Sequence, residues 1–229
     1  MIVSHARRFI FFHNPKCAGT AIHNALQPFH DDATTFWGPR DVPYFQNRLD
    51  HTHLRLWELA AAYPALFRAA TEDYRSVIFV RNPYARFLSA VAEHFRKFRR
   101  ELLFETLSRE EQAAMVTRFL DRELTIERIT TDWTTIHFSP QIWFIRLGDR
   151  VVPRTILPLD AEGRVMPVAF TALGLPAVDV GRVNPSPYDL RHLLTVRRVV
   201  SFIEEFYEQD FAFLRGNPMF TGLVARLDR

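Results

Sequence analysis

The chain has 229 residues and a formal net charge of +3 at pH 7, with 48% hydrophobic and 24% charged residues. This composition excludes a disordered or fibrous protein, and no apolar run approaches the roughly 18 residues that a membrane span needs. The single cysteine, Cys17, excludes an intrachain disulfide and a cysteine-rich zinc site, so we expect a reducing compartment, the cytoplasm.

We expect one domain over residues 1–229, because no repeat, low-complexity tract or flexible linker divides the chain. The first strand is predicted at Phe9–His13, followed by a loop and by a helix at Thr20–Leu26 that Thr20 caps. The turn-rich residues 28–50 are expected to be irregular. Apolar spacing predicts further helices at 54–70, 84–98, 109–124, 142–147 and 190–207, and further strands at 76–80 and 154–159. This alternation predicts an α/β fold of three layers with a mostly parallel central sheet.

The loop Asn14–Gly19 leads directly from the first predicted strand into a helix. A helix N-terminus presents several backbone N–H groups and the positive end of the helix dipole, which together suit an anion. Lys16 adds an ammonium and Thr20 a hydroxyl, so the segment predicts a P-loop-like cradle for a phosphate or a sulfate. It is not a Walker A motif, which places its Lys directly before the Ser or Thr. The alternative is an ordinary strand–helix connection with one lysine in it.

A second strand–turn–helix segment repeats this logic. The apolar strand at 76–80 ends in Arg81, and Ser89 follows two helical turns later. At the carboxyl end of a parallel strand, Arg81 would face the crevice where α/β sheets bind ligands, and its guanidinium can hold a phosphate with two bonds. The alternatives are a surface salt bridge for Arg81 and a close helix contact for Ser89.

Taken together, these segments resemble the sulfotransferases that use 3′-phosphoadenosine-5′-phosphosulfate (PAPS), and most closely the carbohydrate branch with the heparan 2-O-, chondroitin- and HNK-type enzymes. FIFFHNPKCAGTAI is similar to the phosphosulfate loop of that family, and VIFVRNPYARFLSA to its 3′-phosphate segment. Weaker similarities follow in the family's order: LDHTHL at 49–54, HFSPQ at 137–141, VNPS at 183–186 and YEQDF at 207–211.

The resemblance implies a binding role for two groups of residues. Lys16 would contact the phosphosulfate and offset the charge that develops as PAP leaves, while Arg81 and Ser89 would hold the 3′-phosphate. The full set of implied cofactor contacts is Lys16, Cys17, Ala18, Gly19, Thr20, Ala21, Arg81, Ser89, Asn184 and Ser186.

The resemblance also implies a histidine base, because sulfonate transfer to a hydroxyl requires a group that accepts the proton. We prefer His53 to His51, which would lie on the same side if their segment is extended, and His13 is a rival. The two histidines could instead bind a metal or cap the next helix, but no further ligand cluster supports a metal. His137 and Gln141 either line the acceptor site or hold the fold together.

The sequence thus predicts a PAPS-dependent enzyme that sulfates a hydroxyl of a small-molecule or glycan acceptor, with PAPS as co-substrate and no metal. The absence of a disulfide pair and of a membrane anchor favours a bacterial-type cytoplasmic enzyme. No nucleic-acid motif accompanies the basic residues. The alternatives are a P-loop-type small-molecule kinase and a non-catalytic nucleotide- or glycan-binding domain; the oligomeric state is not indicated.

Overall fold

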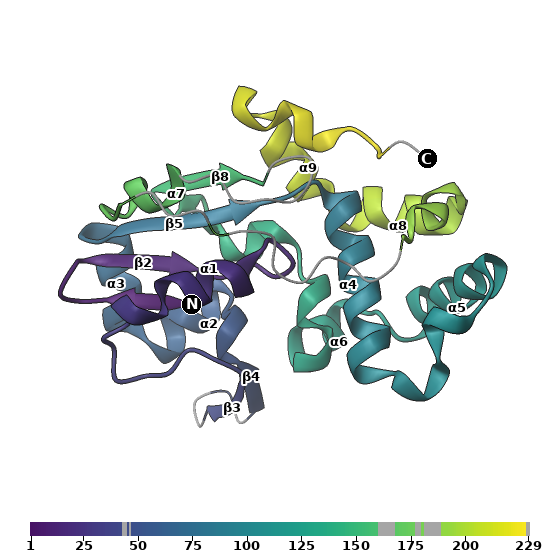
Figure 1. The fold of residues 1–229 in the computed structure, drawn as a ribbon, viewed down its shortest axis with the longest axis horizontal. Helices are drawn as coiled ribbons and strands as arrows, with labels where there is room; N and C mark the ends of the chain where they lie inside the picture. The colour runs from purple at the N-terminus through teal and green to yellow at the C-terminus, as the bar shows by residue number, and fades with distance from the viewer. Residues whose placement is uncertain (43–44, 46, 160–167, 177–179, 181–188, 228–229) are drawn as a thin grey trace. The chain divides into compact units, whose positions relative to one another are not determined.

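The computed structural model describes residues 1–42, 45, 47–159, 168–176, 180 and 189–227. The chain divides into two compact units, each with its own packing. Unit 1 comprises Met1–Val80 and Gln141–Val183, and unit 2 comprises Arg81–Pro140 and Asn184–Arg229. The chain passes from unit 1 to unit 2 directly after the second predicted strand (Figure 1).

Unit 1 is built on a four-stranded sheet. Its strands are β1 (Ile2–Ser4), β2 (Phe9–Phe12), β5 (Arg75–Val80) and β8 (Thr155–Pro158), in the order β1-β2-β5-β8. β2, β5 and β8 run parallel, and only β1 is antiparallel to its neighbour. Parallel strands need crossover connections, which helices supply here, so the predicted α/β fold with a mostly parallel central sheet is confirmed.

Both faces of this sheet are buried, as three layers require. Alternate residues Phe9, Phe11, Val77 and Phe79 join one hydrophobic cluster with side chains of α1 (Gly19–Leu26) and α7 (Val168–Ala172). The intervening residues point to the opposite face because side chains alternate along a strand. Those of β2 and β5 are 0–3% exposed: Ile10, Phe12, Ile78 and Val80.

The connection between α1 and β5 differs from its prediction in two places. Residues 28–50 contain a hairpin, β3 (Pro39–Val42) paired antiparallel with β4 (Asn47–Asp50). The single helix predicted at 54–70 is broken into α2 (Leu56–Ala62) and α3 (Pro64–Glu72), because Pro64 cannot continue a helix but fits its first turn. The short elements of unit 1 are η1 (Gln27–Phe29), η3 (His51–His53), η7 (Gln141–Phe144), β6 (Arg146–Leu147) and β7 (Arg150–Val151).

In unit 2, the described regular elements are all helical. The longest helix, α4 (Pro83–Phe98), begins at Asn82, whose side chain accepts hydrogen bonds from the N–H groups of Tyr84 and Ala85. The other helices of unit 2 are α5 (Arg109–Arg122), α6 (Ile126–Thr131), α8 (Arg197–Phe206) and α9 (Glu208–Arg215), with shorter turns η4 (Arg100–Leu102), η5 (Phe104–Thr106), η6 (Trp133–Phe138), η8 (Arg191–Thr195) and η9 (Pro218–Val224).

Most of the other predicted elements are confirmed within a few residues, but two more differ from their prediction in type or extent. Residues 142–147 form a 3₁₀ turn and the short strand β6 instead of a helix. The last helix, predicted at 190–207, is the 3₁₀ turn η8 followed by α8, and a further helix, α9, succeeds it. One functional domain over 1–229 stays a prediction.

Candidate functional site

The loop between β2 and α1 has an unusual backbone. Lys16 and Ala18 both adopt positive φ angles, 61° and 57°, although neither is a glycine. Such left-handed residues cost of order 1 kcal/mol each, and they persist where the surrounding structure enforces them, often at ligand-binding loops. Because they lie two residues apart on either side of Cys17, they give the loop a tight curve directly before α1.

The N-terminus of α1 is open to an anion. Its N-cap residue is Ala18, no side chain makes a capping hydrogen bond, and the first turn holds no acidic residue. The predicted cap, Thr20, is therefore wrong: Thr20 is the second residue of the helix, with a half-buried side chain. A helix start without a competing side-chain oxygen retains its positive partial charge for a ligand.

Buried polar groups hold the loop between β2 and α1 in place. Asn14 Nδ2 donates to the backbone oxygen of Phe79, 2.8 Å away, and contacts Gln141 Oε1 at 3.4 Å. The Cys17 thiol also points to Gln141 Oε1, at 3.6 Å. Cys17 and Gln141 are only 1% and 2% exposed. These contacts give both side chains a supporting role under the loop; a contact of Gln141 with an acceptor stays a prediction.

Two histidines meet beside the loop. The rings of His13 and His53 lie edge to face with centroids 4.5 Å apart, and both side chains are buried. His13 also packs against Gly19, where a Cβ atom would lie 1.8 Å from His13 Nε2. The histidine turn and the N-terminus of α1 therefore converge on one place in unit 1.

His53 has the surroundings of a neutral imidazole with one fixed ring nitrogen. Its Nδ1 lies 2.8 Å from Asp50 Oδ2, and each of these side chains is 10% exposed. Burial lowers the pKa of His53 below its ordinary value, Asp50 opposes this shift, and the charges of the Met1 amino group and Lys16 lower the pKa further. Because the charge of Lys16 lowers the pKa of His53, the loop and the histidine turn interact electrostatically. The two segments are separate motifs in the sequence.

His51 has a different environment. Its Nε2 lies 2.8 Å from the hydroxyl of Tyr63, and its ring packs against Phe36 and Tyr63. The segment is a 3₁₀ turn, η3, and not the extended strand in which both imidazoles would share a side. His53 is thus the histidine of this turn that packs against His13, and the ring contacts of His51 belong to a separate cluster.

The residues predicted to hold the 3′-phosphate belong to unit 2. Arg81 directly precedes the N-cap of α4, and its side chain is half-buried, as is that of Ser89. Ser89 is seven residues beyond Asn82, nearly two helical turns, so it lies on the same face of the helix about 10 Å along its axis. Asn82 already caps the first N–H groups of α4, so an anion here would be bound by side chains.

A buried cation that no sequence motif indicated supports α4. Arg86 is 1% exposed, its guanidinium donates to the backbone oxygen of Ser139 at 2.5 Å, and it lies over the ring of Tyr207. The Tyr207 hydroxyl in turn donates to the backbone oxygen of Phe138. Phe138 and Ser139 of the HFSPQ segment thus meet Tyr207 of the YEQDF segment around Arg86 in the core of unit 2. His137 precedes Phe138 in the turn η6 and is 8% exposed.

Two of the predicted cofactor contacts, Asn184 and Ser186, lie outside the described residues. In the part of the chain that is described, no group of three histidine, cysteine or acidic side chains is arranged to hold a metal ion. Likewise, none of its helices combines the length and apolar character of a membrane span.

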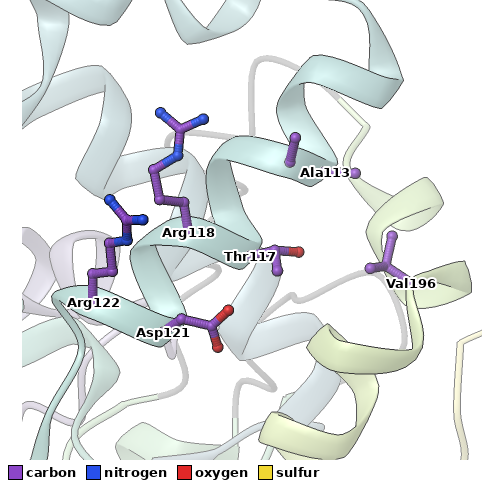
Figure 2. A pocket seen from close by; sticks show the side chains of 7 residues that line it. Ala113, Thr117, Arg118, Asp121, Arg122 and Val196 are labelled. Atoms are coloured by element: carbon purple, nitrogen blue, oxygen red, sulfur yellow. The ribbon is translucent and has the colours of Figure 1, made fainter.

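A surface pocket of unit 2 is formed by other residues. It is lined mostly by α5, together with Val196 before α8 (Figure 2). Its charged lining residues are Arg118, Asp121 and Arg122, and Asp121 accepts a hydrogen bond from Arg198. None of the predicted site residues that the structure describes lines it.

A comparison with known protein families bears on the segments described above. The family model described as "Sulfotransferase family" matches residues 1–149, which include the Lys16 loop, the His53 turn and the Arg81 segment. The chain belongs to the sulfotransferase family. Its members transfer a sulfonate group, so the family supports a sulfonate transferase. No curated protein and no solved structure matched the chain.

Proposed function

We propose that this sulfotransferase moves the sulfonate of PAPS to a hydroxyl group of a carbohydrate or glycoconjugate, with His53 as general base. The observation that carries the proposal is the convergence, within unit 1, of the strained Lys16 loop, the uncapped start of α1 and the buried His53. Together they offer an anion site and a neutral base near one another.

The donor is bound by charge and by backbone amides. The loop residues 16–21 bind the phosphosulfate, with the hydroxyl of Thr20 beside the amides. Arg81 and Ser89 bind the 3′-phosphate, the group that distinguishes PAPS from ATP. Lys16 is suited to the transferring end because its ammonium is a compact point charge on a flexible stem.

The transfer is an in-line displacement. His53 Nε2 accepts the proton of the acceptor hydroxyl as the acceptor oxygen bonds to sulfur. The bond between sulfur and the bridging oxygen breaks, and its electron pair remains on the phosphate of PAP. Lys16 offsets the charge that develops there. The neutral state of His53 favours this role, because an imidazolium has no lone pair to accept a proton.

The cell compartment and the acceptor are also proposals. The single cysteine, buried under the loop, supports the cytoplasm as the place of action. A carbohydrate acceptor rests on the resemblance to the carbohydrate branch.

Thermal unfolding with nucleotides tests the donor. At 100 times its dissociation constant, PAP should stabilise the fold by about 2.7 kcal/mol, a rise in Tm of roughly 5–10 °C for a chain of this size. ATP with magnesium should give a much smaller rise, which separates this proposal from a kinase. Equal rises, or no rise with PAP, would rule out PAPS as the donor.

A substitution at the base tests the chemistry separately. His53→Ala should abolish sulfonate transfer from PAPS and leave the PAP-induced rise in Tm intact. His51→Ala is the matched control, since it removes the neighbouring imidazole of the same turn. If His53→Ala also abolishes the PAP effect, His53 is structural and the base must be sought elsewhere.

A further inference from the structure

We infer that Asp50 is a positioning residue for the base: it fixes the His53 imidazole in the tautomer that carries its hydrogen on Nδ1 and keeps a lone pair on Nε2. The inference rests on the proposed function and adds a residue to which no sequence motif gave a role. Its evidence is the geometry of the turn that joins β4 to η3.

Both carboxylate oxygens of Asp50 are engaged by this turn. Oδ1 accepts the backbone N–H of Thr52 at 2.9 Å and thereby caps η3, while Oδ2 lies 2.8 Å from His53 Nδ1. The turn is fixed further by Gly38, whose N–H donates to Thr52 Oγ1 at 2.7 Å and whose oxygen accepts from the N–H of His51 at 3.0 Å. The carboxylate and the imidazole are therefore held by a rigid local frame.

The chemistry of the two groups decides the tautomer. An ionised carboxylate only accepts hydrogen bonds, so the ring nitrogen facing it must be the one that carries the hydrogen. A neutral imidazole has one such nitrogen, which leaves Nε2 as the acceptor. When Nε2 takes a proton during transfer, the carboxylate at 2.8 Å also offsets the charge of the imidazolium.

Other charged and titratable groups near His53 act on it in a different way. Lys16 and the Met1 amino group lower the pKa of His53 by their charge, and His13 contacts the ring edge to face. Asp50 is the acidic group among them. It therefore sets which nitrogen carries the hydrogen, whereas Lys16 and burial favour the neutral state.

The variant Asp50→Asn tests this with little change of shape. The amide oxygen must remain toward the N–H of Thr52, because the opposite orientation would place two donors face to face. The amide NH₂ then points at His53 Nδ1 and forces that nitrogen to accept, which moves the hydrogen to Nε2. The turn keeps its cap, but the base loses the lone pair that accepts the proton.

Unit 1 offers a matched control at a second aspartate–histidine pair. Asp32 Oδ1 accepts the N–H of Thr34, two residues on, and Asp32 Oδ2 lies 2.8 Å from His5 Nε2. This pair repeats the contacts of Asp50 at an exposed histidine. Asp32→Asn therefore makes the same chemical change away from the candidate base.

The experiment has three measurements. Long-range ¹⁵N–¹H spectra of histidine-labelled protein report the tautomer of His53, which should be Nδ1–H in the wild type and Nε2–H in Asp50→Asn. Release of inorganic sulfate from PAPS, with water in place of the acceptor, should fall at least tenfold in Asp50→Asn and remain unchanged in Asp32→Asn. The rise in Tm with PAP should be the same in all three proteins.

Each outcome is decisive. An Nε2–H tautomer in the wild type overturns the inference without any variant, as does wild-type sulfate release by Asp50→Asn. If PAP gives no rise in Tm in the wild type, the proposed function fails, whatever the tautomer of His53. Loss of the PAP effect in Asp50→Asn alone would make Asp50 a structural residue of the turn and contradict the positioning role.

Discussion

At the residue scale, position 19 requires a glycine because of the adjacent His13 ring and not because of its own backbone angles. It is the first residue of α1 and lacks a positive φ, but a Cβ there would overlap the imidazole of His13. Glycine allows this close approach of ring and helix. The segment HNPKCAG thus encodes a contact between its first and its last residue, positions 13 and 19, that no motif template reveals.

A double-mutant cycle tests this contact. Gly19→Ala should lower the free energy of unfolding by about 1–3 kcal/mol, as overpacking in a closed site does, and weaken PAP binding. His13→Ala removes the ring, so Gly19→Ala should cost much less in that background. Equal costs of Gly19→Ala with and without His13, measured by denaturant unfolding, would show that the ring does not require the glycine.

The two lysines of the chain form a natural comparison, because all 27 other basic residues are arginine. Lys16→Arg keeps the charge and the strained backbone of the loop but replaces a compact ammonium with a wide planar group. We expect sulfonate transfer from PAPS to fall at least tenfold. Lys97→Arg, an exposed change on α4, should leave the rate unchanged. Near-normal transfer by Lys16→Arg would remove the claim that the ammonium itself is needed.

At the element scale, α4 carries an acid-sensitive group into the core of unit 2. His94 is 1% exposed, and its ring lies among Phe95, Phe98, Phe119 and Phe138. Burial lowers its pKa to about 4, a shift that a contact with the Thr134 backbone oxygen opposes and that the charges of nearby arginines assist. The folded protein therefore resists protonation where the unfolded chain accepts it.

The pH dependence of stability follows from this shift. The unfolded imidazole titrates near pH 6.5, so stability is lost as the pH falls from about 6.5 towards 4, by roughly 3 kcal/mol for His94. His94→Phe should remove this part of the loss. His23, whose pKa burial also lowers to about 4, remains in the variant and should retain its own share. Urea unfolding at pH 7 and pH 4.5 measures the loss of stability in the wild type and in His94→Phe. If the two proteins lose the same free energy of unfolding, His94 is not a source of the acid sensitivity.

Elements with strong local signals can be predicted from the sequence, and those set by distant contacts cannot. The apolar strand before Arg81 and the amphipathic α4 have a clear periodicity, and the structure contains both. The hairpin β3–β4 has polar and turn-rich residues, so its structure is decided by strand pairing and not by local pattern. Residue type alone favours Thr20 as the cap, but the cap is Ala18, and the helix begins at Gly19, one residue before its predicted start.

At the scale of the whole molecule, the residues with proposed functional roles come from both units of the chain. Lys16, His13 and His53 belong to unit 1, and Arg81 and Ser89 to unit 2. The loop, the preferred base and the arginine attract a prediction because their residue types are chemically specific, and their roles stay predictions. Asp50 and Arg86 could not be predicted, because an aspartate or an arginine has many surface uses, and only burial and contacts distinguish these two.

The proposed role of Arg81 predicts a specific change in nucleotide preference. Arg81→Ala should weaken PAP binding about 10- to 100-fold, as the loss of a charge-assisted bond to a phosphate does, and leave AMP binding unchanged. AMP is the matched ligand because it lacks only the 3′-phosphate of PAP. Arg122→Ala, in the α5 pocket of the same unit, is the control and should alter neither affinity.

Calorimetric titration of the wild-type protein with PAP and with AMP tests whether PAPS is the donor. PAP should bind at least 10-fold more tightly than AMP, and Arg81→Ala should remove most of this difference. Equal affinities for PAP and AMP in the wild type would contradict PAPS as the donor.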